Sequence, residues 1–257
     1  MRLLKQFVYG AIYLAIFIGL VWFVYSLEFK AAPTCSDNDK NGDEAGVDCG
    51  GSCVSCEIKN LKPLSAGQAI LLGSGRNFSA VAVIRNPNSD FGTNSFDYEA
   101  RFYDASGVLL KSSRGTEFIY PGETKNIIEA GAKIVEGIPT RAEIELLNAG
   151  DISWLKNIDF FEPAYELKSA AAYFENGQVV ISGYVANMTN FAFSRVIISA
   201  FAFDNFGIKI GASKYEIKNL KPFGVAGFKI LIPVDVALSD ALDFEATKQS
   251  IAIGVLK

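Results

Sequence analysis

The residues best suited to chemistry lie in one acidic segment near the N-terminus, from Asp37 to Asp48. Oxygen-bearing side chains stand at positions 1, 3, 5, 7 and 12 of a calcium-loop pattern, with Gly42 at position 6. The five ligand positions are Asp37, Asp39, Asn41, Asp43 and Asp48. In such a loop, side chains at positions 1, 3 and 5 turn inward, position 7 supplies its backbone carbonyl and position 12 its carboxylate. The spacing predicts a structural calcium site.

Two features separate this segment from a helix–loop–helix calcium site. Pro33 and the neighbouring cysteines leave no room for flanking helices, and Asp48 is one methylene shorter than the usual glutamate. We therefore expect weak affinity, with a dissociation constant of about 0.1–1 mM, as in extracellular modules. The alternative is a solvated Asp/Asn/Gly turn that is held by disulfides and binds no ion.

The four cysteines of the chain surround this acidic segment. They are Cys35, Cys49, Cys53 and Cys56. In an oxidising compartment an even number of closely spaced cysteines predicts two disulfides, and three connectivities are compatible with the sequence. A structural zinc site is the alternative, because Cys-x3-Cys-x2-Cys is a plausible thiolate spacing. An extracytoplasmic location, which the charges around the membrane segment indicate, favours the disulfides.

The run from residue 34 to residue 56 resembles a small cysteine-rich module of microbial surface proteins. Its pattern is Cys-x-Asp-x-x-x-Asn-Gly-x-Glu-x-x-Val-Asp-Cys-Gly-Gly-x-Cys-x-x-Cys. The acidic part is also similar to the calcium loops of thrombospondin type 3 repeats and dockerins. Both resemblances imply calcium with a structural role.

The rest of the sequence holds no catalytic pattern. It contains no histidine, which removes Ser-His-Asp and Cys-His arrangements and the usual catalytic zinc sites. The segment Gly73-Ser-Gly75 lacks the third glycine and the helix pattern of a phosphate-binding loop. Glu143 and Glu145 alternate with apolar residues, which is typical of a solvated strand face and not of a glycosidase pair. We predict that the chain is not an enzyme.

The N-terminus carries a candidate membrane anchor. No charged residue lies between Lys5 and Glu28, and the stretch from Phe7 to Leu27 is nearly all apolar. As a helix this stretch would span about 31 Å, which matches the hydrocarbon core of a bilayer. A cleaved signal peptide is the alternative, with Ala31 and Ala32 at the cleavage site. Signal peptides, however, usually have an apolar region of only about 7–15 residues.

The charges around this segment predict its orientation. Arg2 and Lys5 precede it, whereas Glu28 and Lys30 balance each other after it. The positive-inside rule therefore places the N-terminus in the cytoplasm and exports everything beyond residue 30, as in a single-pass plasma-membrane protein. The exported part holds 21 basic and 27 acidic side chains, a net charge of −6. This charge excludes nucleic acid as an expected partner and disfavours docking on an anionic membrane surface.

Beyond residue 57 the sequence has the pattern of β-strands. Apolar residues alternate with polar ones at Phe96–Phe102 and at Ala142–Leu146, which predicts strands with one buried face. Arg195–Phe203 is more continuously apolar, as expected of a central strand. Asp151–Phe161 is the expected last strand of a first domain, and a short helix competes with a strand at Asp240–Thr247.

The strand region contains an internal repeat. Three landmarks recur at an offset of 100 or 101 residues: Val83–Asn86 with Tyr184–Asn187, Asp104–Gly107 with Asp204–Gly207, and Ile119–Pro121 with Leu220–Pro222. The Asp-x-x-Gly units predict hairpin turns, because Asp bonds nearby amides and Gly accepts positive φ. The predicted fold is therefore mainly β. It comprises an N-terminal transmembrane helix (1–30), a disulfide-rich calcium-loop stalk (31–57) and two tandem immunoglobulin-like β-sandwiches (62–160 and 161–257) of about seven strands each.

The strand-and-turn units Arg-Phe-Tyr-Asp-Ala-Ser-Gly and Ala-Phe-Asp-Asn-Phe-Gly resemble FxLYD-type immunoglobulin-like domains of bacterial surface proteins and lipoproteins. The first position of that motif is Ala100 in one unit and Ala200 in the other, where the family has Phe. The stretch from Ile84 to Gly122 is similar to uncharacterised membrane-anchored bacterial proteins, which implies an origin and no known activity.

These features together predict a non-catalytic interaction or scaffold protein of the cell envelope. The bilayer would hold residues 7–27, and an unidentified protein or envelope component would bind the ectodomain. The alternative is an accessory subunit of a membrane-embedded secretion, pilus or transport complex, in which Gly10 and Gly19 would allow close approach of a neighbouring helix.

Overall fold

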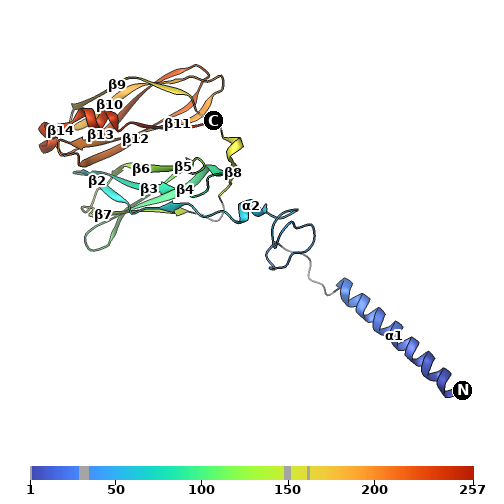
Figure 1. Cartoon of the computed structure of the whole chain (residues 1–257). Coiled ribbons are helices and arrows are strands. Elements are labelled where there is room, and N and C mark those ends of the chain that lie inside the picture. The colour runs from blue at the N-terminus through green and yellow to red at the C-terminus, as the bar shows by residue number, and fades with distance from the viewer. Residues whose placement is uncertain (1, 29–34, 148–151, 161–162) are drawn as a thin grey trace. The chain divides into compact units, whose positions relative to one another are not determined.

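The computed structural model describes residues 2–28, 35–147, 152–160 and 163–257. The chain forms two compact units, Met1–Leu61 and Lys62–Lys257. As the sequence predicts, the architecture is mainly β, with an apolar N-terminal helix, a small module with two disulfides and several antiparallel sheets (Figure 1).

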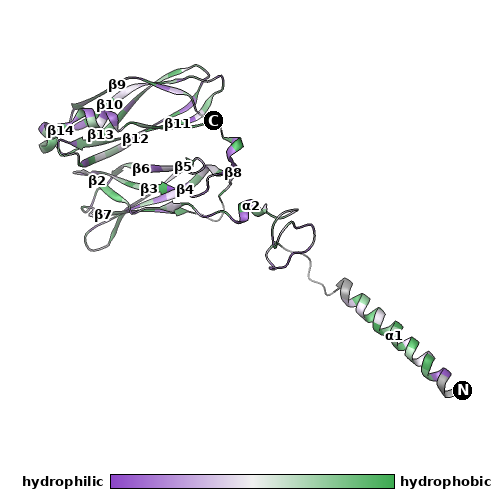
Figure 2. Cartoon of the chain, viewed as in Figure 1, coloured by the Kyte–Doolittle hydropathy of each residue, from purple (hydrophilic) through white to green (hydrophobic). Residues whose placement is uncertain are grey.

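The helix α1 (Arg2–Glu28) contains the predicted membrane segment. Its side chains from Lys5 to Tyr25 are exposed, and the mean hydropathy of this stretch is 2.3. Among the described helices it is the one long and apolar enough to cross a membrane, and Figure 2 shows apolar residues along its length. The candidate cleavage site at Ala31 and Ala32 lies outside the described residues.

The disulfide-rich module that follows has little regular structure. It consists of turns and one short helix, α2 (Cys56–Lys59). Ser55 caps α2, because its Oγ accepts the N–H of Ile58 at 3.3 Å. Between residues 35 and 61, Cys49 is the one apolar residue that is buried. Cross-links and polar contacts must therefore hold the module together, because it has no hydrophobic core of its own.

The first β-sandwich packs two antiparallel sheets face to face. One sheet contains β1 (Ser65–Ala66), β2 (Ile70–Ser74), β3 (Asn77–Arg85) and β6 (Thr124–Lys133). The other contains β4 (Phe91–Tyr103), β5 (Leu109–Ile119), β7 (Arg141–Leu147) and β8 (Leu155–Lys156). The predicted alternation on β4 is confirmed, since its core residues are at most 4% exposed: Phe96, Tyr98, Ala100 and Phe102.

The predicted last strand of this sandwich is shorter than expected. Of Asp151–Phe161, the described residues form only the two-residue strand β8, which pairs with β4, and the 3-10 helix η1 (Asn157–Asp159).

The second β-sandwich also contains two antiparallel sheets. One sheet contains β9 (Tyr165–Glu175), β10 (Gln178–Asn187) and β13 (Val225–Pro233). The other contains β11 (Phe193–Asp204), β12 (Lys209–Leu220), β14 (Leu242–Asp243) and β15 (Ala252–Leu256). β11 pairs with β12 on one side and with β14 and β15 on the other, so the continuously apolar stretch is a central strand, as predicted.

The ambiguous stretch near residue 240 contains both helix and strand. The 3-10 helix η2 (Val236–Ala241) leads into β14, and the short helix α3 (Phe244–Gln249) follows. Asp243 caps α3 by accepting the N–H of Ala246 on Oδ1 at 2.9 Å.

The two sandwiches pack against each other through the outer faces of two sheets. Val81 and Ile128 of the first meet Phe201 and Ala212 of the second, and all four are buried. A hydrogen bond from Ser79 Oγ to the carbonyl of Ala212, at 2.8 Å, crosses the same interface. Contacts therefore unite Lys62–Lys257 into one compact unit, in which the sheets are layered (Figure 1).

Candidate functional site

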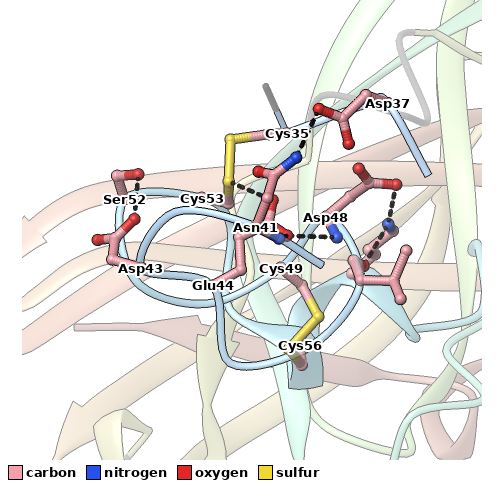
Figure 3. The surroundings of a disulfide bond; sticks show 12 residues. Cys35, Asp37, Asn41, Asp43, Glu44, Asp48, Cys49, Ser52, Cys53 and Cys56 are labelled. Carbon is pink, nitrogen blue, oxygen red and sulfur yellow. Dashed lines mark hydrogen bonds and ion pairs between the residues drawn. A yellow bond between two sulfur atoms is a disulfide. The ribbon is translucent and has the colours of Figure 1, made fainter. Parts of the chain in front are cut away.

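Asp37 and Asn41, at ligand positions 1 and 5 of the acidic loop, lie together in the structure. Asp37 Oδ2 accepts a hydrogen bond from Asn41 Nδ2 at 3.0 Å (Figure 3). Asp37 Oδ1 accepts the N–H of Asp39 at 3.0 Å. Gly42 has φ +57°, which supplies the sharp turn that the pattern requires. The first half of the loop thus has the turn geometry expected from its spacing.

The second half of the loop directs its carboxylates to other partners. Asp48 is buried, its Oδ1 accepts the N–H of Asn38 at 3.0 Å, and its Oδ2 lies 3.2 Å from Lys59 Nζ. Asp43 Oδ1 accepts a hydrogen bond from Ser52 Oγ at 2.9 Å (Figure 3). The carboxylates of Asp43 and Asp48 therefore have partners within the protein, although the ligand predicted at position 7 is the backbone carbonyl of Asp43.

Glu44 organises the loop, although the sequence pattern assigned it no role. Its buried carboxylate accepts the N–H groups of Asn41 and Asp48 on Oε2, both at 3.2 Å. Its Oε1 lies 3.4 Å from Cys53 Sγ (Figure 3). The sequence signal that could have identified Glu44 is its position in the loop, three residues after Asn41 and four residues before Asp48.

The four cysteines form two disulfides, as predicted. Cys35 pairs with Cys53 and Cys49 with Cys56, which selects one of the three compatible connectivities. Among the described residues, Cys35, Glu44 and Cys53 form a group whose possible ligand atoms lie within 4.8 Å of one another. The sulfurs of Cys35 and Cys53 form a disulfide, so they offer no thiolate to a zinc ion.

One feature of the loop fits a bound cation. Oδ1 of Asn41 is buried and has no hydrogen-bond partner, although it stands at ligand position 5. A carbonyl oxygen of this kind is a ligand that Ca²⁺ accepts. The four aspartates, however, do not form a group within 4.8 Å among the described residues. The oxygens of Asp37 and Asn41, at positions 1 and 5, fit calcium. For Asp48 to bind the ion at position 12, its carboxylate must release Lys59.

A second cluster, at the interface of the sandwiches, was not expected from the sequence. Glu117, at the end of β5, is 2% exposed. Its Oε2 lies 3.3 Å from Lys125 Nζ and its Oε1 lies 3.6 Å from Lys214 Nζ of the second sandwich. Lys125 Nζ also donates to the carbonyl of Phe118 at 2.6 Å and lies over that ring. The only local sign was an acid next to the apolar end of a strand.

The cluster continues through the core of the first sandwich. Lys214 Nζ donates to the hydroxyl of Tyr98 at 3.0 Å, and that hydroxyl donates to Glu129 Oε2 at 2.8 Å. Ser113 Oγ donates to the other oxygen of Glu129 at 2.6 Å. Burial, reinforced by the charge of Glu129, raises the pKa of Tyr98 far above its usual range. The hydroxyl therefore stays protonated and can serve as the donor.

A cavity of about 290 Å³ lies beside this cluster, between the sandwiches. Its charged lining groups include Glu117, Lys125 and Lys214, and its apolar lining includes Ile128 and Phe201. Within the interface, the two lysines flank the single carboxylate of Glu117 and neutralise its charge. We therefore assign the cluster to holding the sandwiches together.

The two sandwiches use the same turn chemistry at the landmarks of the sequence repeat. Oδ1 of Asp104 and of Asp204 each accept the N–H groups two and four residues further on, at 2.8–2.9 Å. Gly107 and Gly207 have φ +85° and +77°. The hydrogen bond from the Ser106 side chain, followed by the one from the N–H of Val108, lowers the pKa of Asp104. Both predicted hairpin turns are confirmed.

Two buried asparagines, one in each sandwich, also make matching hydrogen bonds. Asn86 and Asn187 are each 1% exposed. Their Nδ2 groups donate at 2.6–3.1 Å to paired backbone carbonyls: those of Phe91 and Tyr120 for Asn86, and of Phe191 and Lys221 for Asn187. Their Oδ1 atoms accept the N–H two residues on, at 3.0 and 2.8 Å. Each side chain therefore ties three chain segments together at one end of its sandwich.

Comparison with known proteins identifies no family. No family model matches the chain, and no curated protein matches it. Among solved structures it is similar to red sea bream transglutaminase, with 9% identity and a TM-score of 0.25 over 77% of this chain and 32% of that chain. The chain thus spans about a third of the length of that enzyme, and a similarity this low carries no argument about activity.

Proposed function

We propose that the protein is a non-catalytic, membrane-tethered scaffold whose β unit, Lys62–Lys257, binds a partner outside the cytoplasm. The observation that carries this proposal is α1, an apolar helix whose described surface is exposed on all sides. Such a surface needs lipid or another helix around it. Two disulfides just beyond it support an oxidising compartment.

The pairing of charges supports a non-catalytic role. The most buried acid at the sandwich interface, Glu117, is neutralised by two lysines. Glu99 is similarly engaged by Arg101 and Arg114 on the outer face of β4. With no histidine in the chain, these groups serve packing and orientation.

Calcium is part of this proposal as a stabiliser of the stalk. Asp37, Asp39 and Asn41 would supply side-chain oxygens, Asp43 its backbone carbonyl, and Asp48 its carboxylate. A bound Ca²⁺ would neutralise these clustered acids. The resemblance to bacterial surface modules and FxLYD-type domains belongs to the same proposal, and the matching asparagines and turns support a duplicated domain.

The tether is tested in native membranes. Alkaline carbonate extraction should leave the full chain in the membrane pellet, and protease added outside the sealed cell should digest the β unit. Replacing residues 6–27 with an unrelated hydrophobic helix should preserve partner capture. Release by carbonate, or a β unit protected on the cytoplasmic side, would sink the proposal.

The accessory-subunit alternative makes the opposite prediction for the helix replacement. A Cβ added at Gly10 or Gly19 meets no atom of the chain within 4 Å, so both are open to a neighbouring helix. Nine residues of helix place them about half a turn apart, on opposite faces. Each would need its own neighbour. Loss of assembly after the replacement, with the protein still in the membrane, would favour this alternative.

A further inference from the structure

Phe223, in the turn between β12 and β13, combines two costly properties. Its backbone has φ +53°, in the left-handed region that L-residues with bulky side chains rarely adopt. Its ring is 69% exposed, so packing within the chain does little to offset the strain. A strained backbone position that the fold does not require indicates a function.

The first sandwich shows that this turn does not require Phe. Gly122 occupies the same place with φ +65°, directly after a proline in both turns. Its N–H donates to the carbonyl of Asn88 at 2.8 Å, as the N–H of Phe223 donates to that of Thr189 at 3.2 Å. A Cβ at Gly122 would meet nothing nearer than 3.7 Å. The two turns therefore differ in side chain and not in backbone design.

Phe223 has apolar neighbours that are also exposed. Met188 is 51% exposed and adjoins Thr189, which accepts the N–H of Phe223. Val225, two residues on, is 58% exposed. We call Met188, Phe223 and Val225 the apolar tip. Clustering of such side chains on adjacent loops marks a surface that meets an apolar partner.

We propose that the apolar tip inserts into the bilayer that holds α1. This inference rests on the proposed membrane tether. Locally the charge suits lipid headgroups: residues 188–193 and 219–225 contain Lys221 and no acid, although the exported chain carries a net −6. Lys257 lies at the same end, with Nζ 4.8 Å from the ring centre of Phe191. Glu166, two strands from Val225, is paired with Lys168 at 3.0 Å, and exposed charges further away are screened over about 8–10 Å.

The position of the tip within the β unit supports the same occupant. The chain enters this unit at Lys62, whose N–H donates to Asn88 Oδ1 at the Gly122 end of the first sandwich. The hydroxyl of Tyr120, at that end, donates a hydrogen bond to the carbonyl of Val255 on β15. The next residues of β15 lead to Lys257, whose Nζ lies over the ring of Phe191, in the same loop as Met188 of the tip. The tip therefore lies at the end of the β unit that receives the chain from the membrane segment.

Tethering makes a small insertion sufficient. A domain linked to a membrane segment experiences an effective concentration of bilayer that a free domain does not, so weak contacts become populated. One aromatic ring and two aliphatic side chains near lysines have the composition of an interfacial anchor.

The experiment uses the full chain with its disulfides intact, reconstituted in liposomes. Phe223→Cys is labelled with the environment-sensitive dye NBD, and doxyl-labelled phosphatidylcholine acts as the quencher. Phe206→Cys is the matched control, since Phe206 is 85% exposed in the β11–β12 turn at the opposite end of these strands. We expect a blue shift and strong quenching at position 223 and neither at 206, with a larger effect when phosphatidylglycerol is included.

A second variant separates insertion from folding. Phe223→Gly should raise the melting temperature by about 2–4 °C, because it removes backbone strain. In the same variant an NBD group on Met188→Cys should lose its quenching by lipid. The melting temperature should rise while the quenching by lipid falls. Misfolding would lower the melting temperature, so it cannot explain this combination.

The outcomes distinguish the inference from the tether. Retention after alkaline washing without quenching at position 223 would overturn insertion and leave the tether intact. Release from the liposomes by the wash would overturn the tether itself. Dye protection in native membranes but not in liposomes would overturn the bilayer as occupant and point to a protein.

Discussion

Lys214 of the second sandwich lies 3.6 Å from the buried carboxylate of Glu117 in the first. The same ammonium group donates to the hydroxyl of Tyr98 in the core of the first sandwich. One side chain thus connects the second sandwich both to the interface charge and to the first hydrophobic core. The relative placement of the sandwiches depends on a polar contact as well as on the apolar patch around Val81 and Phe201.

Removing this charge should destabilise the β unit. Glu117→Gln leaves Lys125 and Lys214 without their anion and should lower the free energy of unfolding by about 2–4 kcal/mol. Lys214→Met should have a smaller effect of about 1 kcal/mol, because Glu117 keeps Lys125. Urea unfolding followed by near-ultraviolet circular dichroism measures both. The double variant should lose less than the sum of the two, and strict additivity would show that the residues are not coupled.

The buried asparagines should be equally sensitive in the two sandwiches. Asn86→Ala and Asn187→Ala each remove a buried side chain that donates two bonds to backbone carbonyls, and each should cost about 2–3 kcal/mol. Hydrogen exchange should show the loss of protection confined to the altered sandwich. Asn205→Ala, at an exposed turn position, is the control and should change stability by less than about 0.5 kcal/mol. Effects confined to one of the two asparagines would contradict their structural equivalence.

The disulfides should carry the stability of the stalk. The Cys35–Cys53 bond closes a separation of 18 residues and Cys49–Cys56 one of 7. Loop-closure entropy predicts losses of about 3 and about 2 kcal/mol when each pair is changed to serine. Because the module has no apolar core, tryptic cleavage after Lys40 should accelerate in both variants, and more in the first. Unchanged cleavage rates would show that hydrogen bonds suffice.

Calcium should protect the same segment. We expect cleavage after Lys40 to slow as calcium rises through about 0.1–1 mM, with no comparable effect of magnesium. Asp37→Ala combined with Asp48→Ala should abolish the protection.

A matched variant tests the competition seen at Asp48. Lys59→Met removes the ammonium group that lies 3.2 Å from Asp48 Oδ2 and keeps every predicted ligand. It should tighten calcium binding severalfold. If wild type and both variants respond alike to calcium, the loop is a turn that binds no ion.

Acid should weaken the β unit partly through Glu99. The hydrogen bond from Arg101, with further bonds from Ser112 and Arg114, lowers the pKa of this carboxyl below its usual value of 4.5. The folded state then binds the proton more weakly than the unfolded state. Its contribution is therefore present above about pH 4.5 and is lost as the pH falls through the lowered pKa. Glu99→Gln should flatten the acid limb of stability against pH, while Glu136→Gln, at an exposed position, should not.

The local structure of this protein could be predicted from its sequence. The period-two pattern around Tyr98 predicted a strand with one buried face, and the Asp-x-x-Gly units at Asp104 and Asp204 predicted hairpin turns. The uncharged stretch after Lys5 predicted the apolar helix. Each of these depends on interactions within a few residues, which are encoded by residue type and spacing.

Long-range relationships were decided only by the tertiary structure. Three disulfide connectivities were compatible with the cysteine spacing, and the folded loop brings Cys35 to Cys53 because Glu44 gathers the backbone between them. Val81 and Glu117 are buried, and both contact residues of the second sandwich: Val81 packs with Phe201, and Glu117 faces Lys214. Which outer faces meet depends on the shape and charge of both surfaces at once, and no local pattern contains that information.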